Sequence, residues 1–326
     1  MVDKVFIIIF VNKIKQNMTE FKRLPLNEKG ELIKNGWGLK SPRNLVIVKY
    51  PKSGATLSLC NVPKILIADS EKGTEYFKPD NVSMLLDDTV ANQFVSTKKY
   101  GYIPQTIFDL VDEMKKANKM DDYWKAYTAL ENERDIKKKE VMYNALVEQI
   151  NAMPFPILAV DTITSLVAIS NEAALYEYNQ NVKTPKYDIK KVDEYGGSQY
   201  IRRKFSEIKR FIEQNAAPFI QYHGHVASRK KVLKKDDEDV NALDIALDGI
   251  LSTIFTSQSD AVCTFFRDDK GCWLDFLKKD ETDLGSRPQH LSNKKIKIAD
   301  IKKDDDLFPK TYWEQIYPEV TFFNKK

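Results

Sequence analysis

The sequence contains few cysteines, few histidines and no apolar run long enough to cross a bilayer. Its three cysteines are too sparse, and odd in number, for a disulfide framework, so the chain fits a reducing compartment. With three histidines and no Cys-x-x-Cys pair, a structural zinc site has little support. The apolar run at residues 5–11 is far shorter than the roughly 20 residues of a transmembrane helix, and no small-residue cleavage site follows it. We therefore expect neither a membrane partner nor a secretory signal.

The balance of charge says little about partners. The formal net charge of +4 is too small to indicate nucleic-acid binding by itself. A chain of 326 residues with 42% hydrophobic content can bury one large core, or one core with a small appendage. Residues 1–17 precede Met18, which reads like a natural start, and we interpret them as an extension without a structural role. The alternative is an exposed strand that pairs with a neighbouring subunit's sheet.

Four short apolar segments end in polar residues. The first opens the window 44–56, and the others span residues 64–71, 155–162 and 218–225. Such runs, separated by helical stretches, indicate strands of a parallel sheet that is buried on both faces. Ligands bind at the carboxyl ends of the strands in sheets of this kind, and all four polar clusters fall there. The sequence therefore predicts one site built from several strand ends.

Amphipathic patterns predict the helices between these strands. Residues 105–116 place four apolar side chains on one face, and residues 117–150 suggest one or two further helices. Another apolar stripe runs through residues 198–214, and the many charges around it are typical of a solvated helix surface.

The window 44–56 contains part of a phosphate-loop motif. In G-x-x-x-x-G-K-[ST], backbone N–H groups wrap the phosphates, the lysine neutralises them and the hydroxyl ligates magnesium. Gly54 and Thr56 match this motif, whereas Lys49 replaces the first glycine and Ala55 replaces the lysine. Two matches are weak evidence, because an ordinary strand and turn also accounts for them. A natural loss of lysine and an engineered change at Ala55 look identical in the sequence.

The succession of these motifs resembles that of RecA-like ATPases, closest to the phage-type single-domain recombination ATPases. The resemblance covers about residues 40–290: a phosphate loop, a strand ending in Asp-x-Glu, a strand ending in Asp, a strand ending in a polar sensor and a late Asp-Ala-Val strand. It implies a three-layer P-loop NTPase core with a mostly parallel central sheet and helices on both faces. It also implies ATP and Mg²⁺ as cofactors. Residues 1–39 then form an N-terminal extension, and residues 291–326 form a charged C-terminal tail.

The resemblance assigns a role to each strand end. In that family, the glutamate after the second strand polarises the attacking water, which carries over to Glu71. The aspartate of the third strand, here Asp161, holds the magnesium ion together with the hydroxyl of Thr56. The end of the fourth strand senses the terminal phosphate, and His225 is the first candidate and His223 the second. Nucleotide binding falls to the loop residues Pro51, Lys52, Ser53, Gly54, Ala55, Thr56 and Leu57.

Two alternatives concern charge and metal at this site. Because alanine has no donor, we expect Ala55 to impair hydrolysis, although Lys49 or Lys52 can partly supply the missing charge. His223 and His225 lie two residues apart and can share a strand face that binds a metal. A polar strand end beside a nucleotide is the simpler interpretation of both histidines.

Long polar segments follow the third and fourth strands, where RecA-like proteins carry two mobile loops that grip single-stranded DNA. The first, at about 170–198, interleaves lysines with aromatic residues such as Tyr176 and Tyr178, which suit base stacking. The second, at about 226–243, starts basic and turns acidic. The resemblance assigns DNA contacts to Lys190, Lys191, Arg229, Lys230 and Lys231.

The resemblance further implies a ring or filament of identical subunits in a bacterial host's cytoplasm, with a single-strand-binding protein as a further candidate partner. Arg287 is the candidate for a charge supplied to the neighbouring subunit's nucleotide, and an interface or surface role is its alternative. The leading function is a DNA-dependent recombination or replication ATPase. A non-hydrolysing, nucleotide-dependent DNA-binding scaffold is the second. A nucleotide kinase is the least favoured, because no compact arginine-rich lid is visible and Glu71 favours water as the acceptor.

Overall fold

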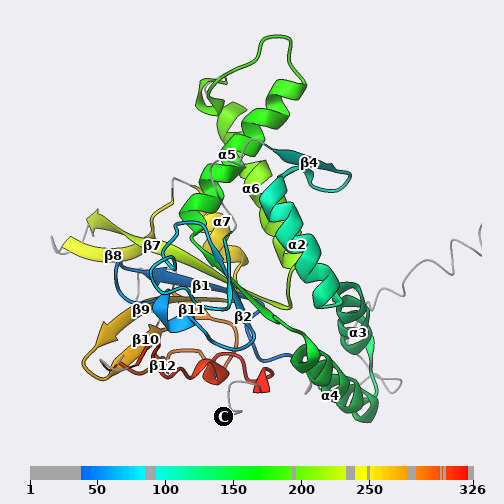
Figure 1. Ribbon diagram of the computed structural model, residues 1–326, viewed down its shortest axis with the longest axis vertical. Coiled ribbons are helices and arrows are strands. Elements are labelled where there is room, and N and C mark those ends of the chain that lie inside the picture. Colours follow the sequence, from blue (N-terminus) through cyan, green and yellow to red (C-terminus); the bar gives the residue numbers. More distant parts are fainter. Residues whose placement is uncertain are drawn as a thin grey trace, which may run out of the picture.

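A mostly parallel, mixed β-sheet forms the centre of the protein (Figure 1). The computed structural model describes residues 38–84, 93–192, 196–232, 239–247, 250–277, 284–301, 303 and 306–321. The predicted N-terminal extension, residues 1–39, lies outside these residues apart from Gly38 and Leu39. The strands of the sheet are β1 (Asn44–Lys49), β2 (Ile65–Asp69), β3 (Val82–Met84), β6 (Ile157–Asp161), β7 (Phe219–Val232), β8 (Asp239–Ile245), β9 (Ala261–Asp268), β10 (Gly271–Asp275), β11 (Gly285–Ser286) and β12 (Lys295–Ala299).

The spatial order of the strands is β12-β10-β9-β1-β7-β6-β2-β3, with β11 paired to β9 and β8 paired to β7. Every pair from β9 to β3 along this order is parallel, whereas β10, β11, β12 and β8 pair antiparallel. The four predicted apolar segments are β1, β2, β6 and β7, and they lie side by side in the parallel part. The predicted α/β class with a mostly parallel sheet is therefore confirmed.

Helices cover both faces of the sheet. The helical elements are α2 (Gln105–Ala117), α3 (Met120–Asn132), α4 (Ile136–Ala152), α5 (Ile163–Gln180), α6 (Gly196–Asn215) and α7 (Ile250–Gln258), with the short 3-10 turns η1 (Leu57–Leu59), η2 (Ile189–Lys191) and η3 (Trp313–Gln315). The helix predicted at residues 105–116 is confirmed as α2, and residues 117–150 form α3 and most of α4. None of the described helices has the length and apolar character to cross a membrane.

Alternation along β1 decides which side chains meet which helices. Leu45 and Ile47 pack in a cluster with α3, α4 and η3, on what we call the α3–α4 face. Val46 and Val48 pack in a second cluster with α2, α5, α6 and α7, on the α2–α6 face. This period of two follows from the pleat of a strand, and here both sides are buried. The sheet is therefore the middle layer between two apolar cores.

The sheet and its core extend beyond residue 290. The segment 291–326, which the sequence suggests is a charged tail, supplies β12 to one edge of the sheet. It also supplies η3, and Trp313 of η3 and Tyr317 just after it are fully buried against the α3–α4 face. The Trp313 indole N–H donates to the carbonyl oxygen of Ser58 at 2.9 Å. The C-terminal segment is thus part of the core and packs beneath the turn that follows β1.

The two segments predicted as long mobile loops are largely regular. Residues 170–180 belong to α5 and residues 196–198 to α6, so only the tip between these helices is a loop. Tyr176 stacks on Phe94 of the small hairpin of β4 (Phe94–Thr97) and β5 (Gly101–Pro104), with ring centroids 4.5 Å apart. In the second segment, β7 continues through residue 232 and pairs with β8 as a β-hairpin. Both segments are polar in composition, but helix packing in the first and strand pairing in the second give them regular structure.

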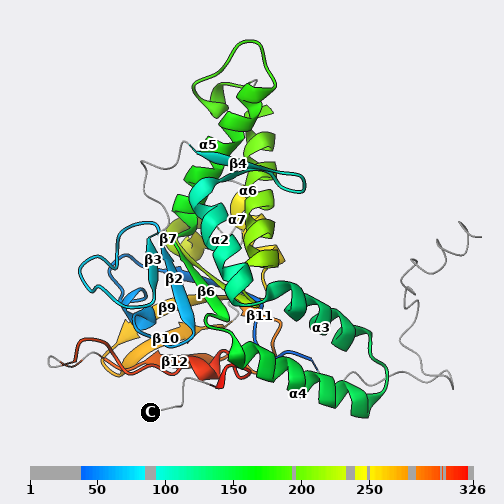
Figure 2. The same ribbon diagram turned by 45° about the vertical axis from the view of Figure 1, so that its right-hand side comes forward.

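A buried lysine fastens α6 to α5. Lys204 is fully buried, and its Nζ atom lies 2.5 Å from carboxylate oxygens of both Glu177 and Glu207. Burial alone raises the pKa of Glu177, but hydrogen bonds from Lys204 and from the Tyr102 N–H, together with nearby positive charge, bring it below its usual value. Figures 1 and 2 show that α5 and α6 rise together from the sheet, so this ion-pair cluster stiffens a projecting unit.

We predict that Lys204→Met lowers the free energy of unfolding by about 3 kcal/mol, because two acidic side chains lose their buried cation. Urea denaturation followed by circular dichroism measures this loss. The matched control is Arg210→Met on the exposed side of the same helix, for which we expect a change below about 0.5 kcal/mol. Equal urea midpoints for Lys204→Met and the unchanged protein would show that the cluster contributes nothing.

Candidate functional site

The chain leaves the adjacent strands β1 and β7 over opposite faces of the sheet. After β1, the turn η1 packs Leu59 and Cys60 into the α3–α4 face. After β7 and β8, helix α7 packs Leu251 and Phe255 into the α2–α6 face before the chain enters β9. Where neighbouring parallel strands send their connections to opposite sides, a crevice opens at their carboxyl ends. The predicted site residues at the ends of β1, β2, β6 and β7 lie around this position.

The segment between β1 and η1 is a tight turn whose last backbone N–H groups are not bonded within the described part of the chain. Lys52 and Gly54 have positive φ angles of 61° and 92°. The Ser53 N–H donates to the Tyr50 carbonyl at 3.2 Å, which closes the turn. Within the described part of the chain, the N–H groups of Gly54, Ala55 and Thr56 have no acceptor. Successive free N–H groups in such a turn form a concave site for an anion.

Ala55 points away from this turn and into the core. Its side chain is only 2% exposed and belongs to the apolar cluster of the α3–α4 face. Between this turn and β2, the regular element is η1, a 3-10 helix of three residues. The loop therefore offers backbone donors but no cation at the position where the motif carries lysine.

A positive charge near this turn is supplied by Lys49 of strand β1. Lys49, the last residue of β1, is 5% exposed, and its ammonium forms a short hydrogen bond and ion pair with Oδ1 of Asp161. The same ammonium donates to Oγ1 of Thr56 at 3.1 Å, and that hydroxyl donates to Oδ2 of Asp161 at 2.6 Å. Burial alone raises the pKa of Asp161, but the charge of Lys49 and the two hydrogen bonds bring it below its usual value. The carboxylate is thus ionised and fully engaged.

This arrangement fits an ammonium and does not fit a divalent metal. Magnesium needs near-octahedral oxygen ligands at about 2.0–2.1 Å, and it is repelled by an adjacent positive charge. Thr56 and Asp161, the predicted metal ligands, are both bonded to Lys49. Among the described residues, no group of three or more His, Cys, Asp or Glu side chains is placed to hold a metal ion. His223 and His225, the alternative metal pair, belong to no such group among these residues.

Glu71 and His225 meet at the outer part of the site. Oε1 of Glu71 accepts a hydrogen bond from the Thr162 hydroxyl at 2.6 Å, and its Oε2 lies 3.4 Å from Nε2 of His225. The side chains of Glu71 and His225 are 40% and 28% exposed, so both reach solvent. Glu71 is therefore an oriented carboxylate beside an imidazole ring, which is the geometry needed to position a water molecule.

His223 lies deeper than His225. It is fully buried, and burial lowers its pKa to about 3, so the ring is neutral. Its Nε2 lies 3.3 Å from Oε1 of Gln221, and its Nδ1 has no partner among the described residues. A neutral, enclosed imidazole does not reach a ligand at the mouth. Of the two histidines, His225 is therefore the one that reaches solvent.

Asp69 holds the loop that presents Glu71. Its Oδ1 accepts from the N–H groups of Glu71 and Gly73 at 3.0 and 3.2 Å, and its Oδ2 accepts from the N–H and hydroxyl of Thr74 at 2.8 and 2.5 Å. All of the acceptor directions of this 2%-exposed carboxylate point into its own loop. The two carboxylates of the Asp-x-Glu sequence thus have separate roles, one structural and one facing the site.

The remaining predicted residues lie away from the crevice. Lys190 and Lys191 are exposed at the tip between α5 and α6. Arg229, Lys230 and Lys231 lie in the extended part of β7 opposite β8. Lys52 is exposed on the turn.

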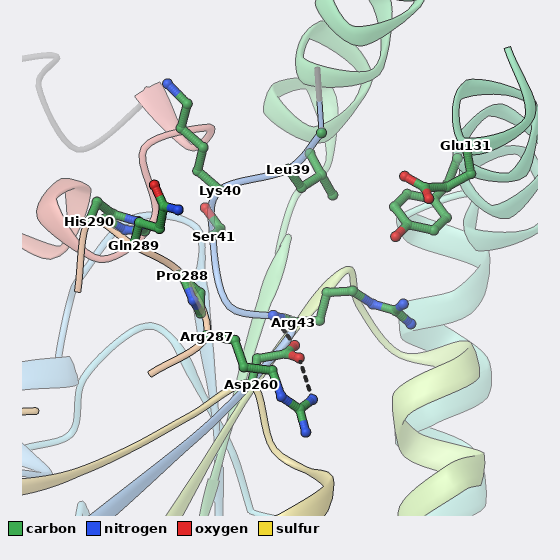
Figure 3. Close-up of a pocket in the computed structure, with 12 residues that line it drawn as sticks. Leu39, Lys40, Ser41, Arg43, Glu131, Asp260, Arg287, Pro288, Gln289 and His290 are labelled. Atoms are coloured by element: carbon green, nitrogen blue, oxygen red, sulfur yellow. Dashed lines mark hydrogen bonds and ion pairs between the residues drawn. The ribbon is translucent and has the colours of Figure 1, made fainter. Parts of the chain in front are cut away.

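Arg287 lies near the amino-terminal ends of β1 and β9, at the opposite edge of the sheet (Figure 3). Its guanidinium is 3.3 Å from Oδ1 of Asp260 and donates to the Ser257 carbonyl at 3.0 Å. It lines a cavity of about 630 Å³ together with residues 38–41, Arg43 and residues of α3. Its contribution to a neighbouring subunit's nucleotide stays a prediction.

Sequence reasoning missed the hydroxyl groups that orient this site. Thr162 fixes Glu71, and Ser70 donates its hydroxyl to the Asp161 carbonyl at 2.7 Å while accepting from the Thr162 N–H at 2.8 Å. These bonds tie the ends of β2 and β6 together. The available signal was the pairing of a strand-end carboxylate with a neighbouring hydroxyl in Asp69-Ser70 and in Asp161-Thr162.

Comparison with known proteins assigns no family to this chain. No protein-family model matches the sequence, and no curated protein is significantly similar to it. The functional assignment consequently depends on the chemistry of Lys49, Thr56, Glu71 and Asp161.

We predict that Asp69→Ala lowers the free energy of unfolding by at least about 2 kcal/mol, because three N–H groups and one hydroxyl lose a charged acceptor. Thermal unfolding measures the loss, and limited proteolysis checks that cleavage appears within residues 70–81. Asp80→Ala, at an exposed position in the same loop, is the control and is expected to change neither. A protease pattern and midpoint unchanged in Asp69→Ala would remove the anchoring role.

Proposed function

We propose that this chain is a RecA-like nucleotide-binding protein that binds ATP in the crevice between β1 and β7, hydrolyses it slowly and acts on single-stranded DNA. The observation that carries this proposal is the convergence of Lys49, Thr56, Glu71, Asp161 and His225 at adjacent strand ends. The order of motifs along the chain and their meeting in space are independent facts, and the same function accounts for both.

The phosphate chain is the part of ATP that this site suits best. The free N–H groups of Gly54, Ala55 and Thr56 supply hydrogen bonds from fixed backbone. Lys49 supplies positive charge directly beside them. Phosphoryl transfer depends mainly on positioning and charge stabilisation, which these groups provide without covalent chemistry.

Glu71 is the residue that we propose orients the attacking water. The Thr162 hydroxyl fixes one carboxylate oxygen, and the other faces His225 and solvent. Hydrolysis is expected to be slow, because Ala55 leaves the loop without a cation that can follow the terminal phosphate. The second candidate function, a non-hydrolysing nucleotide-dependent scaffold, is favoured by this same burial of Ala55.

We predict that Glu71→Gln lowers ATP turnover by at least about 10²-fold, because the amide cannot accept a proton from water. ATP affinity, measured by isothermal titration calorimetry, should change by less than about threefold. Phosphate release at saturating ATP measures turnover. The control is Glu75→Gln, an exposed glutamate four residues along the same loop, which should leave turnover unchanged.

Each outcome of that comparison is decisive. ATP binding without turnover in the unchanged protein would favour the non-hydrolysing scaffold. Equal turnover in Glu71→Gln and the unchanged protein would remove Glu71 from the reaction. The absence of ATP binding to the folded, unchanged protein would sink the nucleotide-binding proposal altogether.

The tip between α5 and α6 is the surface that we propose contacts single-stranded DNA. It carries exposed lysines at positions 183, 186, 190 and 191, and Tyr187 is 98% exposed. Exposed rings stack on bases while lysines neutralise phosphates, a combination that tolerates any sequence. The tip stands at the far end of the projecting helices, above the carboxyl edge of the sheet (Figure 2).

We predict that the double variant Lys190→Gln/Lys191→Gln weakens binding of a fluorescent oligo(dT) and reduces the slope of log affinity against log salt by about 1.4, which is the share of two phosphate contacts. The matched control is Lys137→Gln/Lys138→Gln, an exposed lysine pair at the start of α4. Fluorescence anisotropy at several salt concentrations measures both. An identical slope in the two double variants would show that the tip does not contact the phosphates.

A further inference from the structure

Lys49 is held in the site by strand pairing on both sides. It pairs with His225 of β7 on one side and with Phe265 of β9 on the other, so its backbone lies in the centre of the parallel strands. Alternation along β1 directs its side chain to the same face as Leu45 and Ile47, where the turn crosses. A glycine at this position leaves that space empty. The lysine fills it with a cation whose position is fixed.

Lys49 is bonded to both of the predicted metal ligands, Thr56 and Asp161. Its ammonium donates to Asp161 and to Thr56, and the Thr56 hydroxyl donates a hydrogen bond to the second oxygen of Asp161. The ammonium carries three protons, and two of them point at these acceptors. Among the described residues, no acceptor is bonded to the third proton. A phosphate oxygen bound by the N–H groups of the turn would supply one.

From this geometry we infer that Lys49 takes the place of the divalent metal, so that ATP binds at this site without Mg²⁺. The inference rests on the proposed nucleotide-binding function and specifies its cation. Lys49 bridges the strand-end carboxylate and the phosphates, which is the position that a metal ion occupies in a complete phosphate-loop site. Its single charge is already beside Asp161 before the nucleotide arrives.

The test compares ATP binding with Mg²⁺ and with EDTA by isothermal titration calorimetry. The unchanged protein should bind ATP with dissociation constants that differ by less than about threefold between the two buffers. Lys49→Met should bind ATP at least about tenfold more weakly in EDTA, because a charged hydrogen bond is lost. Added Mg²⁺ should restore part of this affinity, because the variant frees Thr56 and Asp161. The control Lys137→Met, at an exposed lysine at the start of α4, should behave like the unchanged protein.

A second variant distinguishes loss of ATP binding from loss of folding. Lys49→Met leaves Asp161 buried without its cation, so we also propose Lys49→Met/Asp161→Asn, which removes both charges together. The double variant should fold, as judged by circular dichroism, and should bind ATP weakly in both buffers. Binding of Mn²⁺ alone, followed by electron paramagnetic resonance, should appear in Lys49→Met and be absent from the unchanged protein and the double variant.

The possible results separate the two proposals. If the unchanged protein binds ATP in Mg²⁺ and loses more than about tenfold in EDTA, the metal is required and the role given to Lys49 is wrong, while the nucleotide site stands. Tight binding of Mn²⁺ to the unchanged protein overturns the inference in the same way. If ATP binds in neither buffer, the proposed function fails before the question of the cation arises.

Discussion

The ion pair between Lys49 and Asp161 is the constraint on which the site depends. It joins β1 to β6 across the intervening strand β7, and it lies almost completely out of water. Removing two charges from water costs free energy that only close contact and further hydrogen bonds can offset, and the Thr56 hydroxyl supplies one of these. Because Thr56 ends the turn after β1, the same carboxylate fixes both the strand ends and the loop. The strand ends and the turn are therefore held in one geometry before any ligand binds.

The parallel part of the sheet was predictable because its strands are apolar on both sides. Leu45 to Val48 alternate between two buried faces, so the sequence shows a continuous apolar run. The C-terminal strand was harder to recognise. In β12, Lys295 is exposed and Lys297 is half-buried at the edge, while the isoleucines between them are buried, and this alternation was hidden by the charged residues that flank it. The stripe at residues 198–214 predicts most of α6, whereas the end of α5, residues 170–180, reads as a loop. Tyr176 in that part packs on β4 and β5, a partner that local sequence does not reveal.

For the site, the sequence predicts which residues share an edge but not which of them touch. Asp69 and Glu71 are equivalent by composition, yet backbone N–H groups surround Asp69 and leave Glu71 facing outward. His223 and His225 share a strand face, and only their depth, fully buried against partly exposed, separates an enclosed ring from one at the mouth. Such distinctions depend on where neighbouring strands end, and the register of the sheet sets that. The sequence pattern shows on which face of a strand a side chain lies, but it does not show how deeply that side chain is buried.

The two departures from the phosphate-loop motif are physically linked. Ala55 places a methyl group in the core of the α3–α4 face, where a lysine has to bury its stem and turn its charge back toward the turn. Lys49 already provides a cation in that direction, bonded to Asp161 and Thr56. If residues 49 and 55 were both lysine, two positive charges would face the single buried carboxylate of Asp161. If residue 49 were glycine, that carboxylate would have no cation beside it. Replacing one lysine in an otherwise complete loop accounts for Ala55 and leaves Lys49 unexplained, whereas relocation of the charge onto the strand accounts for both.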